Sequence, residues 1–83
     1  PNPFNPSTTI SYELPQDGLV SITVMDLTGR HVASLVSGEQ RSGIHSVRWN
    51  STNDSGQKVS AGMYYYKIQV GDFTETRKMT LLK

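Results

Sequence analysis

The amino-acid sequence predicts an all-β fold, an immunoglobulin-like antiparallel β-sandwich of about seven strands. Apolar and polar residues alternate in several short segments, as expected of strands that bury one face. Gly, Pro, Asn and Asp residues separate these segments at intervals of roughly 8 to 12 residues, the spacing typical of a sandwich. No segment shows convincing helical periodicity, and 83 residues provide one hydrophobic core and no second domain.

The chain is predicted to enter the domain through a linker. Residues 1–7 include three prolines, which remove the backbone donors that a strand or helix needs. The domain itself is expected over residues 8–83. Its first strand covers residues 8–14, where one face carries the larger apolar and aromatic side chains, Ile10, Tyr12 and Leu14.

Two further strands are expected, each after a turn. Pro and Gly within residues 15–18 allow the chain to reverse, and the next strand alternates over residues 20–24. Residues 26–30 form a second turn. The strand after it, residues 31–36, alternates imperfectly, and we expect a bulge or an edge position because not all of its apolar residues can share one face (Val32, Ala33, Leu35 and Val36).

The middle of the chain is predicted to hold one strand between two loops. Residues 38–43 and residues 50–56 are almost entirely polar or small, and both predict loops. Between them, His45, Val47 and Trp49 alternate with polar residues and share one face of a strand.

The strongest strand pattern lies near the C-terminal end. It spans residues 63–70, and Gly71-Asp72 then forms a two-residue hairpin connection. The last strand runs from residue 73 to about residue 82. We expect it at a sheet edge, where unpaired backbone groups could receive another strand.

Composition excludes several function classes. The net charge is +1 without any run of like charge, which argues against nucleic acid and anionic membranes as partners. Without cysteine, the chain has neither a disulfide framework nor a thiolate metal site. No apolar run is long enough to span a bilayer. The chain begins with neither an initiator Met nor a signal peptide, so we expect a piece of a longer protein. As an isolated domain it is expected to be a monomer.

Catalytic and metal sites are not predicted. His31 and His45 have no partners at ligand spacing, and His45 and Ser46 are neighbours on a strand, so their side chains point to opposite faces. The loop at residues 50–56 has oxygen-bearing side chains at alternate positions, as at the start of a calcium loop. However, Ala61 occupies the position where a calcium loop carries its Glu, and calcium binding at this loop is left open. We expect no enzyme activity and no cofactor.

The three consecutive tyrosines are expected to serve the core. Alternation directs Tyr64 and Tyr66 inward with Ile68, which leaves Tyr65 outward for a ligand. A single outward ring is a small platform for a sugar. Two functions nevertheless stay open beside the one favoured below: a carbohydrate-binding module, or a structural spacer or adhesion module, appended to an extracellular enzyme.

Five segments of the chain occur in the order found in one known family. They are Pro1-Asn2-Pro3-Phe4-Asn5-Pro6-Ser7-Thr8-Thr9-Ile10, Asp26-Leu27-Thr28-Gly29-Arg30, Asp54-Ser55-Gly56, Gly62-Met63-Tyr64-Tyr65-Tyr66 and Lys78-Met79-Thr80-Leu81-Leu82-Lys83. With these segments the sequence resembles the type A C-terminal sorting domain of type IX secretion cargo. That class is similar to the immunoglobulin-like domain of the flagellar hook-capping protein. The resemblance extends over essentially the whole chain.

The resemblance implies a non-catalytic sorting domain. Such a domain directs a secreted cargo protein through an outer-membrane translocon, after periplasmic transit, to the surface of a Gram-negative-type bacterium. The implied partners are the outer-membrane secretion machinery, a sortase-like protease and an upstream cargo domain in the same chain. One departure is the single terminal Lys where many members carry two basic residues. The implied sorting residues are Pro1, Asn2, Pro3, Phe4, Asn5, Pro6, Gly29, Arg30, Gly62, Tyr64, Lys78, Leu81, Leu82 and Lys83.

Overall fold

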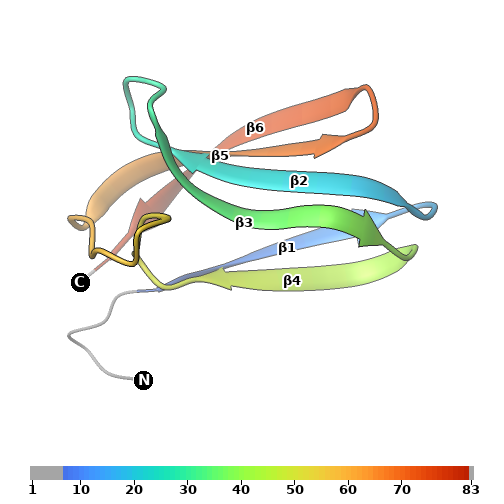
Figure 1. The fold of residues 1–83 in the computed structure, drawn as a ribbon, viewed down its shortest axis with the longest axis horizontal. Helices are drawn as coiled ribbons and strands as arrows, with labels where there is room; N and C mark the ends of the chain where they lie inside the picture. The colour runs from blue at the N-terminus through green and yellow to red at the C-terminus, as the bar shows by residue number, and fades with distance from the viewer. Residues whose placement is uncertain (1–6, 83) are drawn as a thin grey trace.

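Six antiparallel strands form two facing sheets in a computed structural model of the chain, which describes residues 7–82 (Figure 1). One sheet has two strands in the order β1-β4, and the other has four in the order β3-β2-β5-β6. The predicted all-β immunoglobulin-like sandwich is confirmed, with six strands and no helix among the described residues. The strands are β1 Thr8–Leu14, β2 Gly18–Met25, β3 His31–Gln40, β4 Gly43–Trp49, β5 Gly62–Val70 and β6 Phe73–Leu81.

The two-stranded sheet follows the predicted alternation. Strands β1 and β4 pair in continuous register from Thr8 opposite Trp49 to Leu14 opposite Gly43. Ile10, Leu14 and Trp49 are buried and Tyr12, His45 and Val47 are half-buried, while the side chains that alternate with them are exposed. Period two therefore identified the inward face of this sheet correctly.

The four-stranded sheet is built around β2. Val20, Ile22 and Val24 on this strand are buried, because β2 lies between β3 and β5 and faces the other sheet. On β5, Tyr64 and Ile68 are buried as predicted. The hairpin at Gly71-Asp72 and the edge position of β6 are also as predicted.

Strand β3 is longer than predicted and irregular in the predicted way. The register with β2 shifts twice, leaving Leu35 and Val32 without partners, and β3 forms an edge of its sheet. Both expected causes of its imperfect alternation are thus present. The predicted loop at residues 38–43 is wrong for Gly38 to Gln40, which pair with the start of β2. Their polar side chains are tolerated because a backbone ladder does not depend on side-chain type, and an edge strand needs no second buried face.

Two contiguous clusters make up the core of this cysteine-free domain. At one end, Trp49 and Tyr64 meet edge to face with ring centroids 5.0 Å apart. The indole Nε1 donates to the Thr52 carbonyl oxygen at 2.8 Å, and the Tyr64 hydroxyl donates to the Ser60 carbonyl oxygen at 2.6 Å, much as in the tyrosine corner of immunoglobulin domains. The clusters are Ile10, Leu14, Val20, Ile22 and Ile68, and Val24, Ala33, Trp49, Tyr64 and Leu81.

Within the described residues, no buried side-chain polar atom lacks a hydrogen bond. That part of the chain also contains no helix long and apolar enough to cross a membrane.

Candidate functional site

The turn between β2 and β3 is organised by one carboxylate. Asp26 Oδ1 accepts hydrogen bonds from the backbone N–H groups of Thr28 and Arg30, at 2.9 and 3.0 Å, and from the Thr28 hydroxyl at 2.6 Å. The Arg30 Nε donates to Asp26 Oδ2 at 3.1 Å. These bonds, led by that from the Thr28 hydroxyl, lower the pKa of Asp26 to about 2. Gly29 has a φ of +88°, which a residue with a side chain rarely adopts.

A second carboxylate attaches the loop after β4 to strand β3. Asp54 Oδ1 accepts from the Ser34 backbone N–H at 2.8 Å, and Asp54 Oδ2 lies 2.7 Å from His31 Nε2. The bond from Ser34, followed by that from His31, lowers the pKa of Asp54. Asn53 Oδ1 accepts from the backbone N–H groups of Ser55 and Gln57, each at 3.0 Å. The loop thus has the geometry of a side-chain-capped turn.

The other described residues of the predicted sorting set lie near the end of the sandwich that carries the β2-β3 turn. Gly62 opposes Leu81 across the β5-β6 ladder, and Leu81 is buried. The Lys78 ammonium sits 5.8 Å from the centre of the Tyr65 ring, and Leu82 is exposed. Met25 pairs with Tyr65, which brings the β2-β3 turn to this end too. The predicted sorting residues at positions 1–6 and 83 lie outside the described residues.

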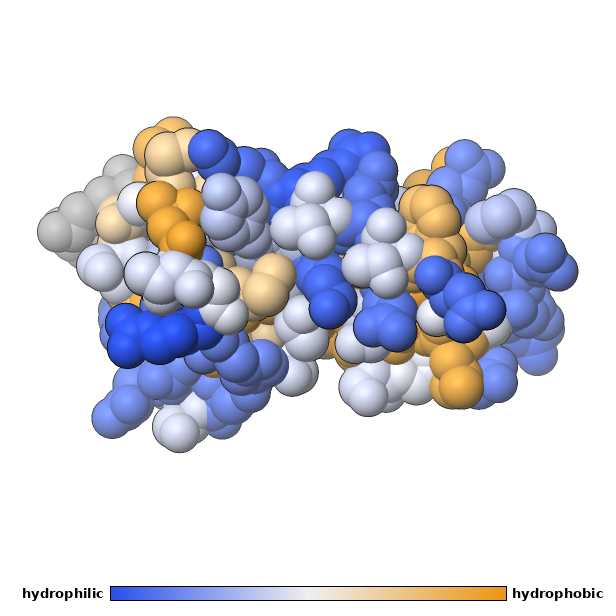
Figure 2. Space-filling view, turned by 90° about the horizontal axis from the view of Figure 1, so that it is seen from above, coloured by the Kyte–Doolittle hydropathy of each residue, from blue (hydrophilic) through white to orange (hydrophobic). Residues whose placement is uncertain are grey.

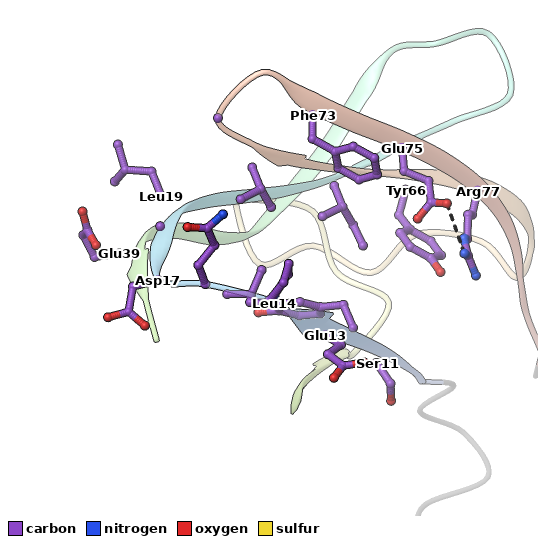
Figure 3. Close-up of a pocket in the computed structure, with 17 residues that line it drawn as sticks. Ser11, Glu13, Leu14, Asp17, Leu19, Glu39, Tyr66, Phe73, Glu75 and Arg77 are labelled. Carbon is purple, nitrogen blue, oxygen red and sulfur yellow. Dashed lines mark hydrogen bonds and ion pairs between the residues drawn. The ribbon is translucent and has the colours of Figure 1, made fainter. Parts of the chain in front are cut away.

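A groove opens at the opposite end of the sandwich, between β1 and the β5-β6 hairpin (Figure 3). Its volume is about 980 Å³. None of the described residues of the predicted sorting set lines it. The groove is therefore separate from the segments that carried the resemblance.

Strands β5 and β6 supply the floor of the groove. The lining residues alternate along both strands and so share the inner face of the four-stranded sheet. Farther along the same face of β6, Met79 is half-buried and Leu81 is buried, whereas Phe73 is 61% exposed. The two-stranded sheet thus covers one half of this face and leaves the other open. The lining residues on β5 and β6 are Tyr66, Ile68, Val70, Phe73, Glu75 and Arg77.

The edge of β1 supplies a wall of the groove. Ser11, Tyr12, Glu13 and Leu14 all line it, although successive side chains of a strand point to opposite faces. Four consecutive residues can border one groove only if it runs along the strand edge. In the described part of the chain, β1 pairs with β4 alone, so its backbone groups on this side have no ladder partner.

The groove combines a mostly apolar floor, on which Glu75 and Arg77 form an ion pair, with an acidic rim. Four of the seven acidic residues of the chain line it, at positions 13, 17, 39 and 75. Among the described residues, Arg77 is the single basic lining side chain, and its Nη2 donates to Glu75 Oε2 at 3.1 Å. This bond raises the pKa of Arg77. The groove is negative on a chain whose net charge is +1.

Tyr12 joins the two sheets beside the groove. Its hydroxyl donates to Gln40 Oε1, and its ring stacks on His45 with centroids 5.4 Å apart. Burial raises the pKa of Tyr12, and the bond to Gln40 opposes that rise. The groove wall therefore rests on a fixed aromatic pair.

The sequence of β6 contains one indication of the groove. Glu75 and Arg77 share a face of β6 with Met79 and Leu81, so two charged residues stand on a face that is otherwise apolar. Such a break in the pattern indicates that part of the face is uncovered.

Figure 2 shows one surface of the domain, where polar side chains separate apolar groups near its two ends.

Comparison with known proteins identifies relatives of most of the chain. The family model of the FlgD Ig-like domain matches residues 5–72. FlgD from P. aeruginosa has 25% sequence identity and a TM-score of 0.71, with 90% of this chain and 59% of that chain covered. FlgD from Xanthomonas campestris has 22% identity and a TM-score of 0.71, with 93% and 56% covered. This chain thus spans less than two thirds of either protein. No curated protein sequence matched it.

These findings correct the resemblance to a type IX sorting domain. The matching family is the FlgD Ig-like domain, so the predicted sorting function, secretion machinery and sortase-like protease are wrong. The segments misled because several of their residues serve the fold: Gly29 forms a turn, Tyr64 a corner and Leu81 the core. Any domain with this fold can need such residues, whatever its function.

The two alternative functions receive no support either. For carbohydrate binding, Tyr65 is only half-exposed, and Lys78 lies against its ring. The chain matches the FlgD Ig-like domain family, so the prediction of a spacer or adhesion module appended to an extracellular enzyme is not supported.

Proposed function

This chain belongs to the FlgD Ig-like domain family, and on that premise we propose that it is a non-catalytic scaffold domain of a FlgD-like protein that works in flagellar hook capping. The match to residues 5–72 is the observation that carries the proposal. The structure of FlgD from X. campestris is described in terms of hook capping essential for flagellar assembly. Because this chain spans 59% and 56% of the two FlgD proteins, hook capping by the whole protein is part of the proposal.

The construction of the domain supports a scaffold role. Two contiguous core clusters and the Trp49-Tyr64 corner hold it together without disulfides. Its two histidines serve local structure, since His31 contacts Asp54 and His45 Nε2 lies 2.6 Å from the Arg41 carbonyl oxygen. A rigid module of this kind can hold the parts of an assembly at fixed positions relative to one another.

Location at the cell surface stays a prediction from the sequence.

In-frame deletion of the domain from the full-length gene tests this function. The deletion strain should lose hooks in electron micrographs and should fail to swim in soft agar. A strain carrying Leu82→Ala, an exposed position outside the groove, is the matched control and should form normal hooks. Immunoblotting must show that the shortened protein accumulates. Normal hooks on cells that contain the shortened protein would refute the proposal.

A further inference from the structure

Among residues 7–82, the six strands leave one position of the immunoglobulin sandwich open beside β1. The order β3-β2-β5-β6 corresponds to strands C′, C, F and G, and the pair β1-β4 corresponds to B and E. In the complete sandwich, strand A pairs with the outer edge of strand B. Within the described residues, no strand occupies the equivalent edge of β1, and the groove lies there.

The geometry of the groove suits an extended peptide. Its wall is the backbone edge of Ser11 to Leu14, which spans roughly 13 Å at about 3.3 Å per residue and can bond a strand of four or five residues. Its floor offers Ile68, Val70 and the exposed Phe73 ring to every second side chain of that strand. An added strand would therefore gain both main-chain bonds and apolar contacts, the two components of strand addition.

The charge of the groove specifies the remaining side chains. An added strand would turn its other side chains to the outer face, where Glu13 is exposed on β1. Opposite charges on neighbouring strands attract, and like charges repel. Asp17 and Glu39 also line the groove, so Lys or Arg fits these positions and Asp or Glu does not.

We propose that the edge of β1 that has no ladder partner among the described residues binds an extended segment of a partner protein in which apolar and basic residues alternate, and that the segment adds to β1 as a strand. The acidic rim, apolar floor and open strand edge act together in this recognition. The inference goes beyond hook capping and does not depend on it, because it rests on the groove alone.

Titration with short blocked peptides tests the proposal. The probe is Lys-Val-Lys-Val-Lys, and the contrast is Glu-Val-Glu-Val-Glu. A third peptide has the sequence of the probe but is methylated on alternate backbone nitrogens, which removes ladder donors and keeps the side chains. NMR titration at low salt should show saturable binding of the probe, weaker binding as salt is added, and little binding of the other two. Amide exchange should slow at β1 positions that do not face β4.

Two pairs of variants separate the rim from the floor. Glu13→Lys should weaken binding about threefold to tenfold, since it replaces attraction by repulsion at an exposed site, and Asp72→Lys outside the groove should change binding less than about twofold. Phe73→Ala should weaken binding about tenfold, whereas Ile44→Ala, at another exposed apolar residue, should not. Unchanged amide spectra away from each site would show that the variants fold.

Several results would overturn the proposal. Equal binding of the acidic peptide would remove the charge argument, and equal binding of the methylated peptide would remove strand addition. Protection on β6 instead of β1 would place the partner at the wrong edge. Slow exchange of the same β1 amides without any peptide would mean that the edge is already covered, and self-association through β1 in sedimentation experiments would identify a second copy as the occupant.

Discussion

The adjacent leucines at the end of the last strand offer a direct test of the core. Leu81 is 1% exposed in the cluster with Trp49, whereas Leu82 is 72% exposed. Leu81→Ala removes three buried carbon atoms, which at about 0.8 kcal/mol each cost about 2.4 kcal/mol, and the remaining cavity raises the loss to about 3 kcal/mol. A domain of this size has an expected unfolding free energy of about 4 to 12 kcal/mol, so the loss is a large share.

Urea unfolding followed by fluorescence of Trp49, the one tryptophan of the chain, measures this loss. The midpoint should fall by about 2 to 3 M for Leu81→Ala with little change in the slope, because the slope follows the surface exposed on unfolding. Leu82→Ala is the matched control and should move the midpoint by less than about 0.5 M, as expected of an exposed site. Equal shifts for the two variants would refute the assignment of faces on β6.

Three further predictions concern the turns and the corner. Because the pKa of Asp26 lies at about 2, below its ordinary value of 3.8, the stability it contributes should be complete above about pH 4 and lost as the pH falls toward 2; the unfolding free energies of the wild type and Asp26→Asn, measured by urea unfolding at a series of pH values, should therefore differ by a constant amount above about pH 4 and converge as the pH falls toward 2. Gly29→Ala should lower the unfolding free energy by about 1 kcal/mol, since φ is +88°, whereas Gly18→Ala, whose added carbon would meet Val70 at an ordinary 3.6 Å, should be near neutral in the same urea assay. Tyr64→Phe removes the bond to the Ser60 carbonyl and should cost about 1 kcal/mol in thermal unfolding; a loss below about 0.3 kcal/mol would show that this bond does not stabilise the corner.

The described residues of the predicted sorting set and the groove occupy opposite ends of the domain, and this separation explains why the sequence suggested the wrong function. Conspicuous residues such as Gly29 and Tyr64 form a turn and a corner. Residues that line the groove, such as Glu13 and Phe73, are ordinary members of alternating strands. A distinctive sequence can therefore mark a demanding point of the fold, while a binding surface is assembled from unremarkable positions.

The sequence by itself determined the positions and faces of most strands. Alternation placed Ile10, Val24 and Trp49 inward because successive side chains of any strand point to opposite sides, a rule that needs no knowledge of neighbouring strands. It also indicated the bulges of β3 and the β5-β6 hairpin, since both follow from local chemistry.

Only the tertiary structure decided which strands became neighbours. Backbone ladders use the same N–H and C=O groups in every residue, so the sequence does not state that β1 pairs with β4 or that β3 continues to Gln40. The attachment of Asp54 to Ser34 likewise joins residues far apart in the chain. The groove exists because a sheet of two strands faces a sheet of four, and that mismatch arises only when the two sheets pack together.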